Sequence, residues 1–164
     1  MKFKKNSEDI DEDEDEFQSQ EASEKGTVAL NTHERINSEL CGEIQKLEAG
    51  YVELKLVTIP EMVVDSHGLI HSGFIFGAAD YSAMVAVNDK NVVLVASDCQ
   101  FLSPVKMGNI VDFIAKVRHK EGRKRNVHVV GFVYDIKVFE GEFKTVITER
   151  HVLKLKLLDD NEAL

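Results

Sequence analysis

Tryptophan is absent from this 164-residue chain, and proline and cysteine occur only twice each. Cys41 and Cys99 lie far apart, without the paired spacing of zinc sites or of disulfide frameworks, so we expect neither. No stretch approaches the roughly 20 uninterrupted apolar residues of a membrane span. With 43% apolar residues, the chain is predicted to be a cytoplasmic globular protein with no metal and no membrane partner.

Positive charge is scarce at the start of the chain. Residues 1–26 hold ten acidic side chains against four lysines, and all but one of the positions from Glu8 to Glu16 are acidic. Such a block repels itself and has too few apolar groups to bury, so we expect disorder there. The block either keeps the protein in solution or binds a protein partner. The predicted division of the chain is an acidic disordered tail (1–28), a folded domain (29–158) and a C-terminal tail (159–164).

The first periodic pattern of the folded domain predicts an amphipathic helix over residues 31–48. Asn31 and Glu34 have the spacing of a capping box. Apolar side chains then recur at spacings of four, four and three, which places them along one side of a helix that ends before Gly50. These apolar residues are Ile36, Leu40, Ile44 and Leu47.

Segments rich in β-forming residues make up most of the remaining domain. The first, Tyr51–Ile59, alternates between apolar and polar residues and stops at Pro60. Four more follow, connected by glycine-containing turns so short that neighbouring strands must be antiparallel. The sequence therefore predicts a five-stranded antiparallel sheet. Its later strands are expected at residues 92–102, 110–119, 126–138 and 143–157.

One acid interrupts an otherwise apolar run between the first two predicted strands. Asp80 is the only charged residue from Phe74 to Val87. This run predicts a helix over residues 73–88 that is buried on all sides and covered by the sheet, so the fold class is α+β. A buried carboxylate that stays ionised and unpaired costs several kcal/mol. Asp80 is therefore either a hydrogen-bonded structural group or a group used in chemistry.

The residues around this helix carry a family likeness. The pattern of Asp65, then His71-Ser72-Gly73, then Ala79-Asp80 resembles the hotdog-fold acyl-CoA thioesterases, above all the phenylacetate-pathway type. The later strands also resemble the acyl-CoA-sensing domain of bacterial fatty-acid-synthesis repressors. Three residues at the end of the second predicted strand fit the same pattern: Phe101, Pro104 and Gly108.

This resemblance implies a fold and an assembly. The hotdog fold wraps an antiparallel sheet around one long helix, here with the extra N-terminal helix. The resemblance implies acyl-CoA as the ligand of a bacterial protein, with coenzyme A as part of the substrate and no separate cofactor. It also implies a homodimer or a dimer of dimers in which the long helices of two subunits pair.

The chemistry of thioester hydrolysis suggests roles for the residues of the motif. A carboxylate must activate water or attack the carbonyl, and N–H donors must hold the developing oxyanion. Asp80 is the predicted base or nucleophile, the Gly73 amide the predicted donor, and His71 and Asp65 the groups that orient water or substrate. Gly73 and Asp80 lie roughly 10 Å apart by helical rise. One subunit's Asp80 can face Gly73 of the other only if the two helices pair, as the resemblance implies, so the resemblance also implies catalytic sites that combine two subunits.

Cations near the site would bind the phosphates of coenzyme A. The basic segment 118–125 is the densest source of them, although such a segment is also typical of a solvated turn. A net charge of −9 and the lack of a recognition helix argue against nucleic acid as a partner. The residues predicted to bind substrate are His67, Ser72, Phe74, Phe101, Lys106, Arg118, Arg123, Lys124 and Arg125.

Two functions stay open on the sequence. The first is hydrolysis of acyl-CoA at a dimer interface. The second is non-catalytic binding or sensing of acyl-CoA, with a protein partner reading the bound state. Asp80 favours the enzyme, whereas Asp65 and Ser72 replace an Asn and a Gly of the family pattern and favour the binder.

Overall fold

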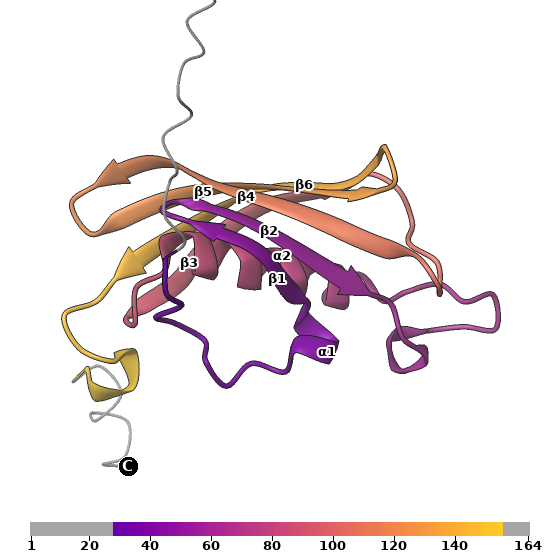
Figure 1. Cartoon of the computed structure of the whole chain (residues 1–164), viewed down its shortest axis with the longest axis horizontal. Coiled ribbons are helices and arrows are strands. Elements are labelled where there is room, and N and C mark those ends of the chain that lie inside the picture. The colour runs from indigo at the N-terminus through magenta and orange to yellow at the C-terminus, as the bar shows by residue number, and fades with distance from the viewer. Residues whose placement is uncertain (1–27, 156–164) are drawn as a thin grey trace, which may run out of the picture.

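A computed structural model describes residues 28–155, so residues 1–27 of the predicted acidic tail and all of the predicted C-terminal tail lie outside the described range. Six strands form one antiparallel sheet in the order β1-β2-β4-β5-β6-β3, and the sheet wraps around a single long helix (Figure 1). No helix in this part of the chain is long and apolar enough to cross a membrane. The strands are β1 (Glu43–Glu48), β2 (Tyr51–Val57), β3 (Val92–Phe101), β4 (Ile110–Glu121), β5 (Lys124–Val133) and β6 (Ile136–Ile147); the helices are α1 (Ser38–Cys41), α2 (Ser72–Val87) and the 3-10 turns η1 (Pro60–Met62) and η2 (Val152–Lys154).

The long helix α2 is the predicted buried helix. It ends at Asn88, which adopts a left-handed conformation (φ 55°) that a short polar side chain tolerates. Alternate residues of the sheet point inward and cover the helix, and the sheet side chains that are no more than 1% exposed are all apolar or threonine. They are Val52, Leu54, Leu56, Val111, Phe113, Ala115, Val127, Val129, Phe139, Phe143 and Thr145. The α+β prediction is confirmed.

The amphipathic helix predicted over residues 31–48 is wrong. Only α1 is helical there, with Asn37 as its cap, and the chain then turns at Gly42 (φ 98°). A Cβ on Gly42 would lie 2.4 Å from Leu54 Cδ2, so this glycine allows the close approach of β2. Residues 43–48 instead form β1, which pairs antiparallel with β2 and buries Leu47 against the core. The sheet therefore has six strands and not five.

The last predicted turn is also misplaced. The sequence suggested a turn at residues 139–142, whereas the β5–β6 hairpin turns at Tyr134 (φ 53°). Gly141 lies inside β6, where an added Cβ would come within 2.8 Å of Cys99 Sγ. This glycine serves close packing between strands and does not make a turn. The strands expected at 126–138 and 143–157 are thus β5 and β6, and residues 148–155 form no strand.

Strand β3 is an edge of the sheet. It pairs only with β6, so its other edge has no partner in residues 28–155. The middle of the strand, from Val95 to Asp98, is exposed, and the Val95 side chain is 60% accessible. An open edge with an exposed apolar side chain is typical of a pairing surface.

Candidate functional site

Asp80 lies near the middle of α2 with a carboxylate that is largely buried. Its Oδ1 atom is inaccessible and has no hydrogen-bond partner among the described residues. Burial raises the pKa of Asp80 from 3.8 to about 6. A carboxylate with these properties changes its charge close to neutral pH, as a general base must.

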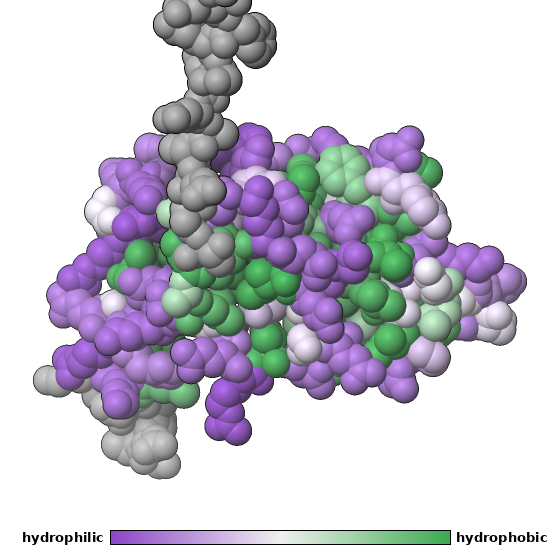
Figure 2. Space-filling view, viewed as in Figure 1, coloured by the Kyte–Doolittle hydropathy of each residue, from purple (hydrophilic) through white to green (hydrophobic). Residues whose placement is uncertain are grey.

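The side of α2 that carries Asp80 faces α1 and β3. Burial raises the pKa of the Cys41 thiol on α1, and the charge of Asp80 adds to the effect. The pKa of Cys99 on β3 is also raised, mainly by burial and in smaller part by Asp80. Figure 2 shows apolar residues gathered in the middle of the face where Figure 1 shows α2 between these elements. The carboxylate therefore lies beside the open strand of the sheet.

A cavity of about 460 Å³ opens at the N-terminal end of α2. Its walls come from the loop before α2, the first turn of α2, the segment after β3 and one residue of β6. No Lys, Arg, Asp or Glu is among the lining residues, and three of them are polar. The lining residues are Val64, Leu69, Ile70, His71, Ser72, Ile75, Phe101, Leu102, Ser103, Pro104, Val105 and Val138. A concave, mostly apolar site with a few polar groups is typical of ligand pockets.

His71 caps α2 at the mouth of this cavity. Its Nδ1 accepts a hydrogen bond of 2.8 Å from the backbone N–H of Gly73. The ring also lies edge-on to Phe74, with 6.1 Å between ring centroids. The Gly73 amide is therefore engaged, and it can bind a substrate carbonyl only if the His71 ring turns away.

Proteins of known structure share this fold. An uncharacterized protein from Pyrococcus horikoshii has a crystal structure similar to this one, with a TM-score of 0.77 and 41% identity over 78% of this chain and 98% of that chain. The family described as Thioesterase superfamily matches residues 67–139, from the loop before α2 into β6. Residues 67–139 of this chain belong to that superfamily. The hotdog fold expected from the sequence is confirmed.

Several curated relatives carry names of enzymes. The acyl-coenzyme A thioesterase PaaI of Escherichia coli (strain K12) is 28% identical over 123 residues, which cover 71% of this chain and 82% of that protein. The methylthioribose-1-phosphate isomerase of Aquifex aeolicus (strain VF5) is 48% identical over 117 residues. That match covers 71% of this chain and 26% of the isomerase, so the chain spans about a quarter of that relative's length.

Asp65, which stands where the thioesterase pattern has Asn, holds the loop before α2. Its Oδ1 accepts hydrogen bonds from the backbone N–H groups of His67 (2.9 Å) and Leu69 (3.1 Å). The loop then contacts the β3–β4 connection, because the Met107 N–H donates to the Gly68 carbonyl at 2.8 Å. Figure 1 shows the two loops side by side at this end of the molecule. Asp65 thereby shapes the cavity wall that includes Leu69.

The structure brings part of the predicted site together. Ser72 and Phe101 line the cavity with His71, whereas Phe74 lies beside His71 outside the lining. His67 and Lys106 are exposed on the two neighbouring loops. These residues are all at the N-terminal end of α2.

The basic segment lies at the other end of the helix. Lys120 and Arg125 border a second cavity, of about 260 Å³, together with Val87 and Asn88 at the C-terminal end of α2. The helix has 16 residues, roughly 24 Å in length. Within one subunit, therefore, the basic residues predicted to bind phosphate lie far from the 460 Å³ cavity. These residues are Arg118, Arg123, Lys124 and Arg125.

Sequence reasoning missed most of the cavity walls. Leu69 and Leu102 are apolar residues in loops, 40% and 45% exposed. Apolar side chains in loops, where polar ones are usual, are the signal that could have identified them. Val138 carried no such signal, since an apolar residue within a strand is expected wherever the strand faces the core.

Proposed function

We propose that the protein hydrolyses the thioester of acyl-CoA, with Asp80 as general base or nucleophile. The observation that carries this proposal is the unpartnered, largely buried carboxylate with a pKa of about 6. Membership of the thioesterase superfamily and the name of the E. coli relative support the same reaction. The open cavity near the start of α2 supplies room for the acyl group.

The cavity also suggests which acyl groups fit. Its 460 Å³ is roughly three times the 150 Å³ cavity that holds a benzene ring. With no ionic side chain in the lining, a terminal carboxylate on the acyl group would lose its hydration without compensation. We expect aromatic or medium-length aliphatic acyl groups to bind best.

Release of free thiol from a panel of acyl-CoA esters tests the proposal. Phenylacetyl-, hexanoyl- and octanoyl-CoA are expected to be hydrolysed, whereas malonyl- and succinyl-CoA are expected to react at least tenfold more slowly. Binding of acyl-CoA without thiol release from any ester would favour the alternative function of a non-catalytic binder. One observation favours that alternative: the Gly73 amide is already bonded to His71.

The proposed site requires a homodimer. Asp80 faces the side of α2 beside β3, and β3 has an open edge. Antiparallel pairing of β3 with its copy would satisfy that edge, extend the sheet across both subunits and cover the apolar face near α2. Asp80 of one subunit would then lie near the helix start of the other.

A lysine at position 95 is expected to convert the dimer to a monomer. Val95 is 60% exposed in the single subunit, so Val95→Lys should fold normally but place a charge in the interface. Val57→Lys is the matched control, because Val57 is 52% exposed on β2, away from β3. Sedimentation at micromolar concentration should show a dimer for the wild type and the control. A monomeric wild type would remove the two-subunit site.

A further inference from the structure

We infer that Arg123 and Arg150 of one subunit bind the phosphates of an acyl-CoA whose acyl group lies in the cavity of the other subunit. This inference rests on the proposed function and on pairing through β3. It explains how cations that lie far from the cavity within one subunit can still serve the same ligand.

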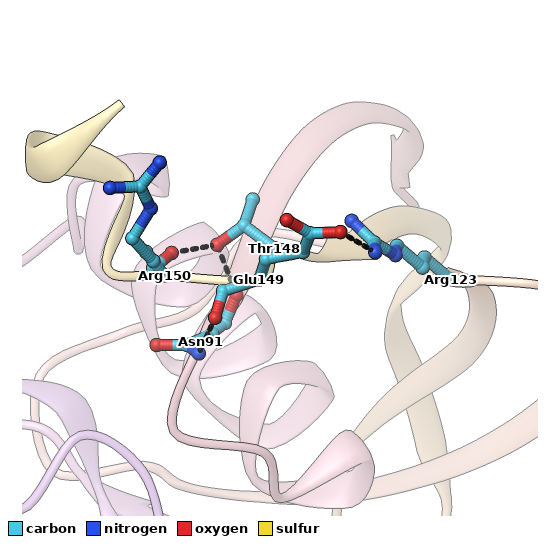
Figure 3. Close-up of polar contacts among 5 residues, drawn as sticks. All are labelled: Asn91, Arg123, Thr148, Glu149 and Arg150. Carbon is cyan, nitrogen blue, oxygen red and sulfur yellow. Dashed lines mark hydrogen bonds and ion pairs between the residues drawn. The ribbon is translucent and has the colours of Figure 1, made fainter. Parts of the chain in front are cut away.

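The two arginines are fixed beside the first residue of β3. On β6, Ile147 lies opposite Val92 of β3, and its N–H donates to the Arg123 carbonyl at 2.9 Å. The Thr148 N–H then donates to the Asn91 carbonyl at 3.1 Å, and the Thr148 hydroxyl donates to the Arg150 carbonyl. Figure 3 shows Arg123 and Arg150 on the two sides of this junction. The backbone therefore holds both residues at the N-terminal end of β3.

The other end of β3 enters the cavity. Phe101, the last residue of the strand, lines it together with Leu102 and Ser103. Antiparallel pairing of two β3 strands about the exposed stretch Val95–Asp98 sets the beginning of one strand beside the end of the other. Arg123 and Arg150 of the partner subunit would then stand at the mouth of the cavity.

The charges at this junction suit an anion. Arg150 is exposed and has no ion pair within residues 28–155. Arg123 pairs with Glu149, but both side chains are more than half exposed, so the pair contributes little and a phosphate can replace the carboxylate. Guanidinium groups bind phosphate with two hydrogen bonds at once. A molecule with an apolar group at one end and phosphates at the other matches both parts of this site.

The first experiment measures by calorimetry how tightly octanoyl-CoA and octanoyl-pantetheine bind. All variants also carry Asp80→Asn, which prevents turnover. Arg123→Glu with Arg150→Glu is expected to weaken octanoyl-CoA binding roughly 10- to 100-fold at low salt, the range for lost hydrogen bonds to charged groups. Binding of octanoyl-pantetheine, which has no phosphates, should stay unchanged. The control, Lys46→Glu with Lys116→Glu, makes the same change in net charge near Tyr51. An equal loss for both thioesters, or no loss for either, would overturn the inference.

Mixed dimers test whether the arginines act across the interface. Leu69→Trp should block the cavity, since Leu69 is a partly exposed lining residue. If the arginines serve the partner's cavity, a dimer of one Leu69→Trp subunit and one double-Glu subunit contains one intact site, with wild-type affinity. If they serve their own cavity, every site in that dimer carries a defect, and the inference fails. A wild type that binds no acyl-CoA would instead refute the proposed function and the inference together, whereas binding without hydrolysis would refute only the enzymatic proposal.

Discussion

Asp80→Asn is expected to lower thioester turnover roughly 10²–10⁴-fold, the usual loss when a general base is removed. The amide keeps the volume of the side chain and cannot accept a proton from water at neutral pH. Wild-type kcat/KM should rise with pH through about 6 as Asp80 ionises, because its pKa is about 6. That limb of the pH profile should disappear in the variant.

The same substitution should alter stability in a direction that depends on pH. The pKa of Asp80 is raised in the folded protein from 3.8 to about 6, so between these values the folded state binds more protons than the unfolded state. The free energy of unfolding of the wild type therefore falls as pH rises through this window, by up to roughly 3 kcal/mol. Asn has no such cost, so the stability of the variant relative to the wild type should increase from pH 4 to pH 7.

Denaturant unfolding at pH 4, 5.5 and 7 measures this difference, with Asp112→Asn as the control. Asp112 is exposed on β4, and its replacement should leave turnover unchanged. A purely structural role of Asp80 would change both results, the turnover of the variant and its stability. Hydrolysis per folded molecule would then survive in the variant, and the variant would lose about 1–3 kcal/mol from a disturbed buried polar group.

Phe139→Ala is expected to destabilise the fold by about 3–5 kcal/mol, the usual cost of removing a fully buried aromatic side chain. Phe139 is 0% exposed. Its ring lies 5.4 Å from that of Phe101 and 6.2 Å from those of Phe113 and Phe143, centroid to centroid. The loss combines apolar burial, the cavity left behind and three aromatic contacts.

Urea unfolding of Phe139→Ala and of Tyr134→Ala provides the comparison. Tyr134 is an aromatic residue only a few positions away, but it is 87% exposed, so its removal should cost less than about 0.5 kcal/mol. Phe139→Ala should also weaken acyl-CoA binding in the remaining folded protein, because Phe101 at the cavity loses its packing partner. A loss below 1 kcal/mol would mean that the core collapses around the gap.

Local patterns predicted the elements whose ends are fixed locally. The buried helix was found because no polar face interrupts it, and β2 because its alternation stops at Pro60. Strand β1 was missed, and a helix was predicted in its place, because the periodic apolar residues of segment 31–48 fit one long helix as well as they fit α1 followed by β1. The deciding contact, Gly42 against Leu54, joins segments that only the folded chain brings together.

In the candidate site, too, the sequence predicted the residue that stands out locally and not the contacts that depend on the folded chain. Asp80 stood out because a lone acid in an apolar run is unusual in any fold. The role of His71 as a helix cap and the loop-forming bonds of Asp65 depend on side-chain directions that spacing does not give. The separation of the basic segment from the cavity follows from which ends of the strands meet, and that order is a property of the whole sheet.

The position of α2 in the chain has a consequence for synthesis. The strands that form the middle of its cover, β4 to β6, all follow the helix, and the last ends at Ile147. After Val87 has been added, about 60 further residues must be made, which takes roughly 3–12 s at 5–20 residues per second. During that interval the nascent chain carries a helix segment with one charged side chain, and only β1 and β2 of the sheet are there to cover it. Slow decoding downstream of α2 should therefore lengthen the time in which the emerging chain can aggregate or be held by a chaperone.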